Sequence, residues 1–152
     1  MNLERTPEFE EALRKIRDGK SFVFITGRAG TGKSTLLKYF VDQCKKRTPV
    51  LAPTGVAALN VGGETIHRFF KIPPSVDLAT ARMEAENRKK PDIYRKIDSI
   101  IIDEISMVRA DLFDAMDLFL QIIRQDKRPF GGVRIIGIGD LYQLPPVVTT
   151  YD

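Results

Sequence analysis

The stretch that decides the fold is Gly27-Arg28-Ala29-Gly30-Thr31-Gly32-Lys33-Ser34. It matches the pattern G-x-x-x-x-G-K-[ST] at every fixed position, and that pattern is typical of loops that hold nucleotide phosphates. Glycines let backbone N–H groups turn toward phosphate oxygens without a Cβ in the way. Lys33 is placed to reach the β- and γ-phosphates, and Ser34 offers a hydroxyl to Mg²⁺. The motif therefore predicts a site for ATP and Mg²⁺.

The predicted nucleotide-binding residues extend from the loop into the start of the next helix: Gly27, Arg28, Ala29, Gly30, Thr31, Gly32, Lys33, Ser34 and Thr35. The motif leaves Arg28, Ala29 and Thr31 unspecified, and we assign them no individual role. A helix that begins near Lys33 would point its positive end at the same anion. The alternative is a chance glycine-rich turn. The strand-like run before the loop and the helical pattern after it disfavour that alternative.

An acidic pair follows the buried strand that Ser99-Ile-Ile-Ile102 predicts. Asp103 and Glu104 would thus lie at the carboxyl end of that strand, where parallel α/β sheets bind ligands. One carboxylate can hold Mg²⁺ while its neighbour orients the attacking water, which favours hydrolysis over simple binding. Taken alone, such a pair is more often a solvated strand end. The phosphate loop in the same chain reverses that preference.

A third element follows the strand predicted at residues 133–138. Gln143, within Gly139-Asp140-Leu141-Tyr142-Gln143, would lie beside the phosphate loop if this strand neighbours the strand at residues 21–26. A glutamine there can hydrogen-bond the γ-phosphate and respond to its loss. A surface glutamine before a Pro-Pro turn is the alternative.

The apolar pattern predicts an α/β fold with a mostly parallel sheet covered by helices on both faces, because apolar runs without alternation are separated by helical segments. Strands are expected at 21–26, 50–53, 99–102 and 133–138, and helices at 9–16, 33–46, 56–59, 79–90 and 112–123. We expect one domain over residues 1–152, in which 71–98 are a candidate small insertion.

Composition narrows the function classes. The 152 residues carry a net charge of +4 with pI ≈ 9.3, which is compatible with a polyanionic partner. No apolar run reaches the roughly 18 residues that a membrane span needs, so no membrane association is expected. Cys44 is the single cysteine, which excludes an internal disulfide. The chain also has a single histidine, and one cysteine with one histidine are too few for a His/Cys zinc cluster.

Together these motifs resemble the petite-integration-frequency (PIF) family of superfamily 1B DNA helicases. The segments that carry the resemblance are Ala52–Asn60 with Gly62, Gly63, Thr65–His67 and Phe69; Ile102–Val108; Asp114–Arg124 with Lys127–Gly132; and Gly139–Val147. The resemblance implies a RecA-like P-loop NTPase fold, ATP-driven 5′-to-3′ translocation on single-stranded DNA and a role in genome maintenance, including repair, recombination and telomere or replication-fork processing.

Residue by residue, the resemblance assigns catalysis to Lys33, Asp103, Glu104 and Gln143, with Ser34 and Asp103 on the metal. Glu104 would activate water. Single-stranded DNA would contact Thr54, Gly55, His67 and Phe69. For the last two, hydrophobic packing in the core is an open alternative.

The chain also departs from the family pattern. Residues 6–10 hold no glutamine for adenine recognition, which leaves other nucleoside triphosphates open, and Arg68 stands where the family tends to have a serine. The family's second RecA-like domain, with its arginine finger, would follow Asp152 and is an expected partner. A stand-alone NTP-binding switch or loader ATPase remains the alternative function, and the intact motifs disfavour a DNA-binding module with a vestigial nucleotide site. The expected location is intracellular: the cytoplasm or nucleoid of a prokaryote, or the nucleus or mitochondrion of a eukaryote.

Overall fold

The computed structural model describes residues 10, 11, 14, 21–26, 39, 41, 42, 48–75 and 77–139. Its strands are β1 (Phe22–Thr26), β2 (Val50–Ala52), β3 (Glu64–Thr65), β4 (Ser99–Ile102) and β5 (Arg134–Gly139). Its helices are α3 (Gly55–Val61), α4 (Ile66–Phe70), α5 (Leu78–Glu86), α6 (Asp92–Arg95) and α7 (Ala110–Ile123), with short 3₁₀ turns η1 (Ile105–Met107) and η2 (Pro129–Gly132). Among these described residues, no helix has the length and apolar character needed to cross a membrane.

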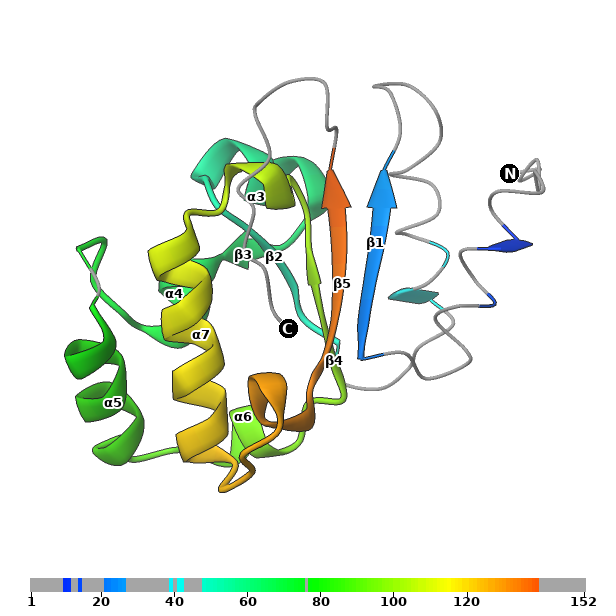
Figure 1. Cartoon of the computed structure of the whole chain (residues 1–152). Helices are drawn as coiled ribbons and strands as arrows, with labels where there is room; N and C mark the ends of the chain where they lie inside the picture. Colours follow the sequence, from blue (N-terminus) through cyan, green and yellow to red (C-terminus); the bar gives the residue numbers. More distant parts are fainter. Residues whose placement is uncertain are drawn as a thin grey trace.

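The five described strands form one sheet in the order β1-β5-β4-β2-β3, and every strand pair is parallel. In Figure 1, α4, α5, α6 and α7 lie on one side of this sheet. The predicted parallel α/β fold is therefore confirmed. The condition on which the Gln143 prediction rested is also met, because β1 and β5 are neighbours.

The isoleucine run of β4 shows that the centre of the sheet is buried on both faces. Ile100 and Ile102 belong to the larger core, which packs against α7, whereas Ile101 belongs to a second cluster on the opposite face. The second cluster includes Val41, from the segment predicted to be helical after the phosphate loop. All four β4 residues are buried, so the strand has no solvent-facing side to alternate.

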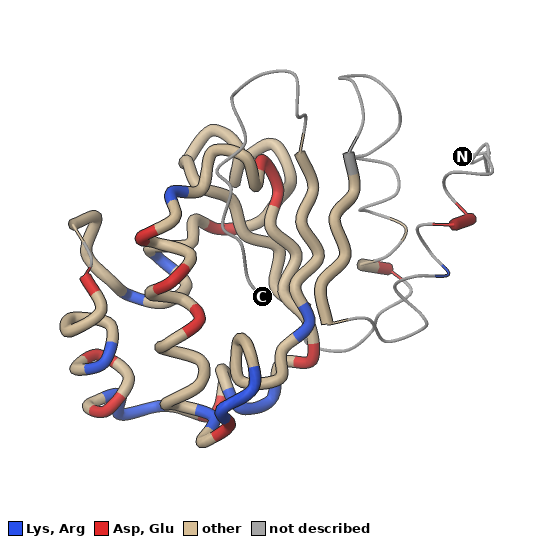
Figure 2. Tube along the Cα trace, viewed as in Figure 1, with Lys and Arg blue, Asp and Glu red and all other residues tan. Residues whose placement is uncertain are grey.

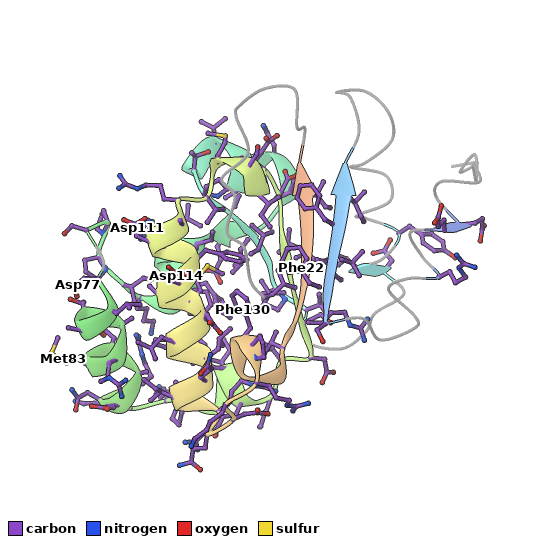
Figure 3. All side chains as sticks on the ribbon, in the orientation of Figure 1. Phe22, Asp77, Met83, Asp111, Asp114 and Phe130 are labelled. Atoms are coloured by element: carbon purple, nitrogen blue, oxygen red, sulfur yellow. The ribbon has the colours of Figure 1, made fainter. Side chains whose placement is uncertain are left out.

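The segment 71–98 does not stand apart from the core. Its helices α5 and α6 both contact α7, and five of its residues join the larger core: Ile72, Ala81, Ala85, Tyr94 and Ile97. Asp77 begins α5 by accepting a hydrogen bond from the Thr80 backbone at 2.7 Å. Figure 3 shows Met83 projecting away from the molecule on this helix, where it is 51% exposed.

Arg124 joins the far ends of several elements. From the C-terminus of α7 its guanidinium donates to the carbonyl oxygens of Tyr94 (2.8 Å), Ile97 (3.0 Å) and Gly131 (2.8 Å). A guanidinium carries five N–H donors in a fixed fork, so one side chain can satisfy carbonyls from three segments. This junction fixes the amino-end side of the sheet, and the candidate site lies at the opposite edge.

Candidate functional site

The carboxyl ends of all five described strands lie along one edge of the sheet, because the strands are parallel. Thr26, the last residue of β1, is in register with Gly139, the last residue of β5. The phosphate loop (residues 27–34) follows β1 directly, and the segment that carries Gln143 follows β5. All of the predicted nucleotide-binding residues (27–35) and Gln143 lie outside the described residues, so the roles of Lys33, Ser34, Thr35 and the rest of the loop remain predictions. The phosphate loop and the Gln143 segment nonetheless begin at neighbouring positions on one edge of the sheet, because β1 and β5 are paired.

Asp103 and Glu104 leave the same edge from β4. The Asp103 N–H donates to the Leu51 carbonyl at 2.9 Å, so the pairing of β4 with β2 continues up to the first carboxylate. Glu104 then reverses the chain with φ 51° and ψ 44°, a left-handed conformation that non-glycine residues rarely adopt. Its carbonyl accepts the Met107 N–H at 3.0 Å, which closes the turn of η1. Both carboxylate residues are partly exposed.

Two glycines of β5 make room for this turn. A methyl group at Gly137 would lie 2.5 Å from Ile105 Cδ1 and 3.1 Å from Phe24 Cδ2. At Gly139 it would lie 3.2 Å from Ile105 Cγ2. Ile105, which directly follows the acidic pair, therefore rests on bare backbone of the neighbouring strand. The glycines of β5 thus help to set the position of Glu104.

The order of the strands sets the spacing within the candidate site. Because β5 lies between β1 and β4, the acidic pair starts two strands away from the phosphate loop. Neighbouring strands lie about 4.8 Å apart, so the separation across the edge is roughly 10 Å. That distance leaves room for a terminal phosphate, a metal ion and a water molecule between the loop and the carboxylates.

The donor set suits Mg²⁺ when a nucleotide supplies the remaining ligands. In the described part of the chain, no three His, Cys, Asp or Glu side chains gather to hold a metal ion. A protein cage for Ca²⁺ or Zn²⁺ is therefore not formed by these residues. Mg²⁺ usually keeps several waters and binds through one or two carboxylates together with substrate phosphates. Asp103 and Glu104 provide that number of carboxylates at the edge where the phosphate loop begins.

The residues expected to contact DNA lie on the other half of the same edge, after β2 and β3. Thr54 caps α3 by accepting the Ala57 N–H at 3.2 Å, and Thr65 caps α4 by accepting the Arg68 N–H at 3.2 Å. Gly55, the first residue of α3, is exposed, and a methyl group there would meet nothing within 4 Å. Both short helices therefore begin at the edge that the acidic pair shares.

His67 is partly buried on α4. Its Nδ1 is buried and has no hydrogen-bond partner within the described residues. A buried polar atom without a partner costs free energy, so packing alone gives no reason for an imidazole at this position. The structure therefore leaves the predicted DNA-contacting role of His67 open.

Phe69 is buried, which does not fit the expectation that its ring stacks on a DNA base. Its side chain is only 6% exposed, and its ring packs against Phe70 (centroids 5.0 Å apart) and Tyr94 (5.3 Å). Both edge-to-face contacts are in the larger core, so this burial argues against base stacking by Phe69. The alternative of hydrophobic packing is the one that the structure favours, and two adjacent phenylalanines were its signal in the sequence.

Comparisons with known proteins point to one family. The family model described as PIF1-like helicase matches residues 2–151. The ATP-dependent DNA helicase Pif1 of Bdellovibrio bacteriovorus is 40% identical over 151 residues, covering 97% of this chain and 34% of the relative. The human ATP-dependent DNA helicase PIF1 is 42% identical over 137 residues, covering 89% of this chain and 21% of the relative.

Solved structures agree with this similarity. Pif1 from Bacteroides sp in complex with ADP-AlF4 has a TM-score of 0.83 and 41% identity, covering 98% of this chain and 35% of that one. Bacteroides Pif1 bound to ssDNA has a TM-score of 0.80 and 40% identity, covering 97% and 34%. The chain thus spans about a third of the length of these relatives, and its fold is that of their RecA-like P-loop domain.

Proposed function

Because the chain belongs to the PIF1-like helicase family, we propose that it is the first motor domain of an ATP-dependent 5′-to-3′ DNA helicase. Within it, residues 27–35 bind the phosphates of Mg-ATP, and Ser34 and Asp103 hold the metal. Glu104 orients the attacking water, and Gln143 contacts the γ-phosphate. The function of such a motor is genome maintenance, in the compartment that holds the DNA.

The observation that carries this proposal is the shared edge of the sheet. The phosphate loop, the acidic pair and the Gln143 segment follow β1, β4 and β5, and β5 separates the other two. Hydrolysis needs a phosphate grip on one side and a water-orienting carboxylate on the other, with the reacting phosphorus between them. Glu104 supports this assignment by its position, because it directly follows Asp103 at this edge. Its left-handed backbone is shared by Lys71, Gln125 and Phe130, so the conformation alone does not mark a functional site.

Single-stranded DNA is proposed to lie on the β2–β3 half of the edge, along Thr54, Gly55 and His67. A threonine hydroxyl that accepts one hydrogen bond still has a proton to donate to a phosphate oxygen. Asp103 is bonded to the end of β2, so the DNA half and the hydrolytic half are joined through two paired strands. A displacement of β2 by DNA would therefore reach the acidic pair directly.

The proposal is tested by nucleotide and DNA binding measured on the same protein. We expect Mg-ADP to bind, a fluorescent oligothymidylate to bind with an affinity that falls as salt rises, and DNA to raise the ATPase rate. Nucleotide binding without DNA binding or stimulation would instead support the switch or loader ATPase. DNA binding with no nucleotide binding at any concentration tested would reject both of these functions.

A further inference from the structure

Helix α4, which carries His67, is too short to fix its own position. It spans Ile66–Phe70, and isolated helices of that length do not persist in water. Its N-terminal end is tied to the sheet through β3, which pairs with β2. What holds its C-terminal end therefore decides how the helix is oriented on the sheet.

Two side chains from the segment after α4 bind its last carbonyl groups. The Tyr94 hydroxyl donates to the Phe69 carbonyl at 2.7 Å, and an Arg88 Nη donates to the Phe70 carbonyl at 2.6 Å. Carbonyls at a helix C-terminus have no partner within the helix, so these two bonds satisfy groups that would otherwise be orphaned. Tyr94 and Arg88 thus form a side-chain clamp on the end of α4.

The clamp is itself held in an aromatic cluster. The Tyr94 ring lies 5.3 Å from Phe69, 6.0 Å from Phe70 and 5.0 Å from Phe119 of α7 (centroid distances). The Arg88 guanidinium carbon lies 5.7 Å from the Tyr94 ring centre and 5.3 Å from that of Phe119. These contacts connect α4 to α7 through one tyrosine and one arginine.

The Arg88 side chain is largely buried. Its side chain is 10% exposed, Glu84 lies 3.4 Å away, and Nε has no partner within the described residues. A charge removed from water is costly unless it is paired, and this one is compensated chiefly by a carbonyl, a carboxylate and two ring faces. The guanidinium is thus held between α4, α5 and α7.

We propose that Arg88 and Tyr94 are positioning residues for single-stranded DNA: they orient α4, and through it His67, without touching the DNA. The inference rests on the proposed DNA-binding function of this edge. Burial raises the pKa of the Tyr94 hydroxyl, so the group stays protonated and able to donate at neutral pH. Through Arg88 and Tyr94, segment 78–95 connects α7 to α4 and so to the DNA-contacting half of the site.

Conservative substitutions test the hydrogen bonds of the clamp while they retain most of its packing or charge. Tyr94→Phe removes only the hydroxyl and keeps the ring, whereas Arg88→Lys keeps the charge and loses the planar fork. Arg82→Lys is the matched control, because Arg82 is on the same segment but its pair with Glu86 is exposed on both sides (57% and 55%). Each variant is titrated with a fluorescent oligothymidylate, with Mg-ADP in calorimetry, and with oligothymidylate in an ATPase assay.

We expect both clamp variants to bind DNA about three- to tenfold more weakly. Tyr94→Phe loses the hydrogen bond to the Phe69 carbonyl, and Arg88→Lys has a different length and no planar fork with which to hold the Phe70 carbonyl in the same geometry. The DNA concentration that gives half-maximal ATPase stimulation should rise, while the maximal rate and Mg-ADP affinity stay at the wild-type values. Arg82→Lys should match wild type throughout. In a His67→Ala background Tyr94→Phe should weaken DNA binding no further, because the clamp acts through His67.

Wild-type affinity for DNA in Tyr94→Phe would overturn the positioning role, as would full additivity with His67→Ala. Tyr94→Phe retains the packed ring, so it decides the question even if Arg88→Lys does not fold. Absence of DNA binding by the wild-type protein is a different outcome, which rejects the proposed DNA-binding function together with the inference.

Discussion

Glu104, which we propose to orient the attacking water, has an unfavourable backbone conformation. Its left-handed conformation (φ 51°) costs on the order of 1 kcal/mol for a residue with a side chain, and only glycine avoids that cost. The residue lies at the end of β4, between the end of β2 and the glycines of β5. The backbone conformation thus favours glycine at this position, whereas the proposed role requires a carboxylate.

Substitutions of Glu104 separate the role of its carboxylate from the cost of its left-handed backbone. Glu104→Gln should bind Mg-ATP nearly as wild type but lose hydrolysis, because the amide keeps the shape and cannot accept a proton from water. Glu104→Gly should also lose hydrolysis, yet raise the free energy of unfolding by up to about 1 kcal/mol because the left-handed strain is relieved. Calorimetric binding, steady-state ATPase and urea unfolding measure the three quantities. Wild-type turnover in either variant would assign water activation to another residue.

Gly55 provides a test for close approach of DNA that does not disturb the fold. A methyl group at this exposed position meets nothing within 4 Å, and alanine is a better helix former than glycine. Gly55→Ala should therefore leave the unfolding midpoint unchanged or slightly higher, and weaken oligothymidylate binding severalfold if a DNA strand lies against α3. Fluorescence anisotropy with the alanine variant decides this, and unchanged affinity would move the DNA path away from Gly55.

At the scale of elements, the site depends on a turn that lies across a neighbouring strand. Ile105 of η1 rests on Gly137 and Gly139 of β5, so the acidic pair after β4 is held by a strand to which it does not belong. Figure 3 also shows Phe130 of η2 and Phe22 of β1, and both rings contact Phe113 of α7. Helix α7 thus packs against η2 and an edge strand of the same sheet.

A methyl group at position 137 tests the turn. Gly137→Ala places Cβ 2.5 Å from Ile105 Cδ1, and we expect a loss of about 1 kcal/mol in the free energy of unfolding together with slower ATP hydrolysis. Ile105→Val in the same protein removes Cδ1 and should restore both. A double-mutant cycle of chemical unfolding and ATPase rates measures the coupling. Additive losses would show that Ile105 does not transmit the effect.

The main elements could be predicted from the sequence, because their apolar runs are long and bounded by clear stops. The four strands from β1, β2, β4 and β5 and the amphipathic α7 were expected near their observed bounds. β3 and α4 were not expected, because a strand of two residues and a helix of five leave no periodicity to detect. The roles of Arg88 and Tyr94 depend on contacts across 18 and 25 residues, which no local pattern encodes.

Across the whole molecule, many of the described Lys and Arg residues lie on the side of the sheet opposite the candidate site (Figure 2). Figure 2 shows Lys and Arg gathered around α6 and the turn after α7. Asp103 and Glu104, in contrast, follow the carboxyl end of β4. Several of these cations have structural duties: Arg124 binds three segments, and Arg128 lowers the pKa of Asp126 to about 2 through their hydrogen bonds. The net charge of +4 therefore does not by itself indicate where DNA binds.

Residues 1–152 by themselves should bind nucleotide but fail to unwind duplex DNA. Translocation on a strand needs two lobes that close on ATP and open on product release. A second lobe can also supply an arginine finger, worth on the order of 10³–10⁵ in rate where one completes a phosphohydrolase. A strand-displacement assay compares this chain with a version of the length of its relatives, which is about three times longer. Robust unwinding by residues 1–152 would contradict the two-lobe argument.

Every function proposed for this chain requires that the carboxyl edge of its sheet bind a nucleotide through the loop after β1. This requirement is tested most directly by calorimetric titration of Mg-ADP into the wild-type chain and into Lys33→Ala. Loss of a charge-assisted phosphate contact is worth about 2–3 kcal/mol, so we predict that the variant binds about 30- to 150-fold more weakly. Equal dissociation constants for the two proteins would contradict the account.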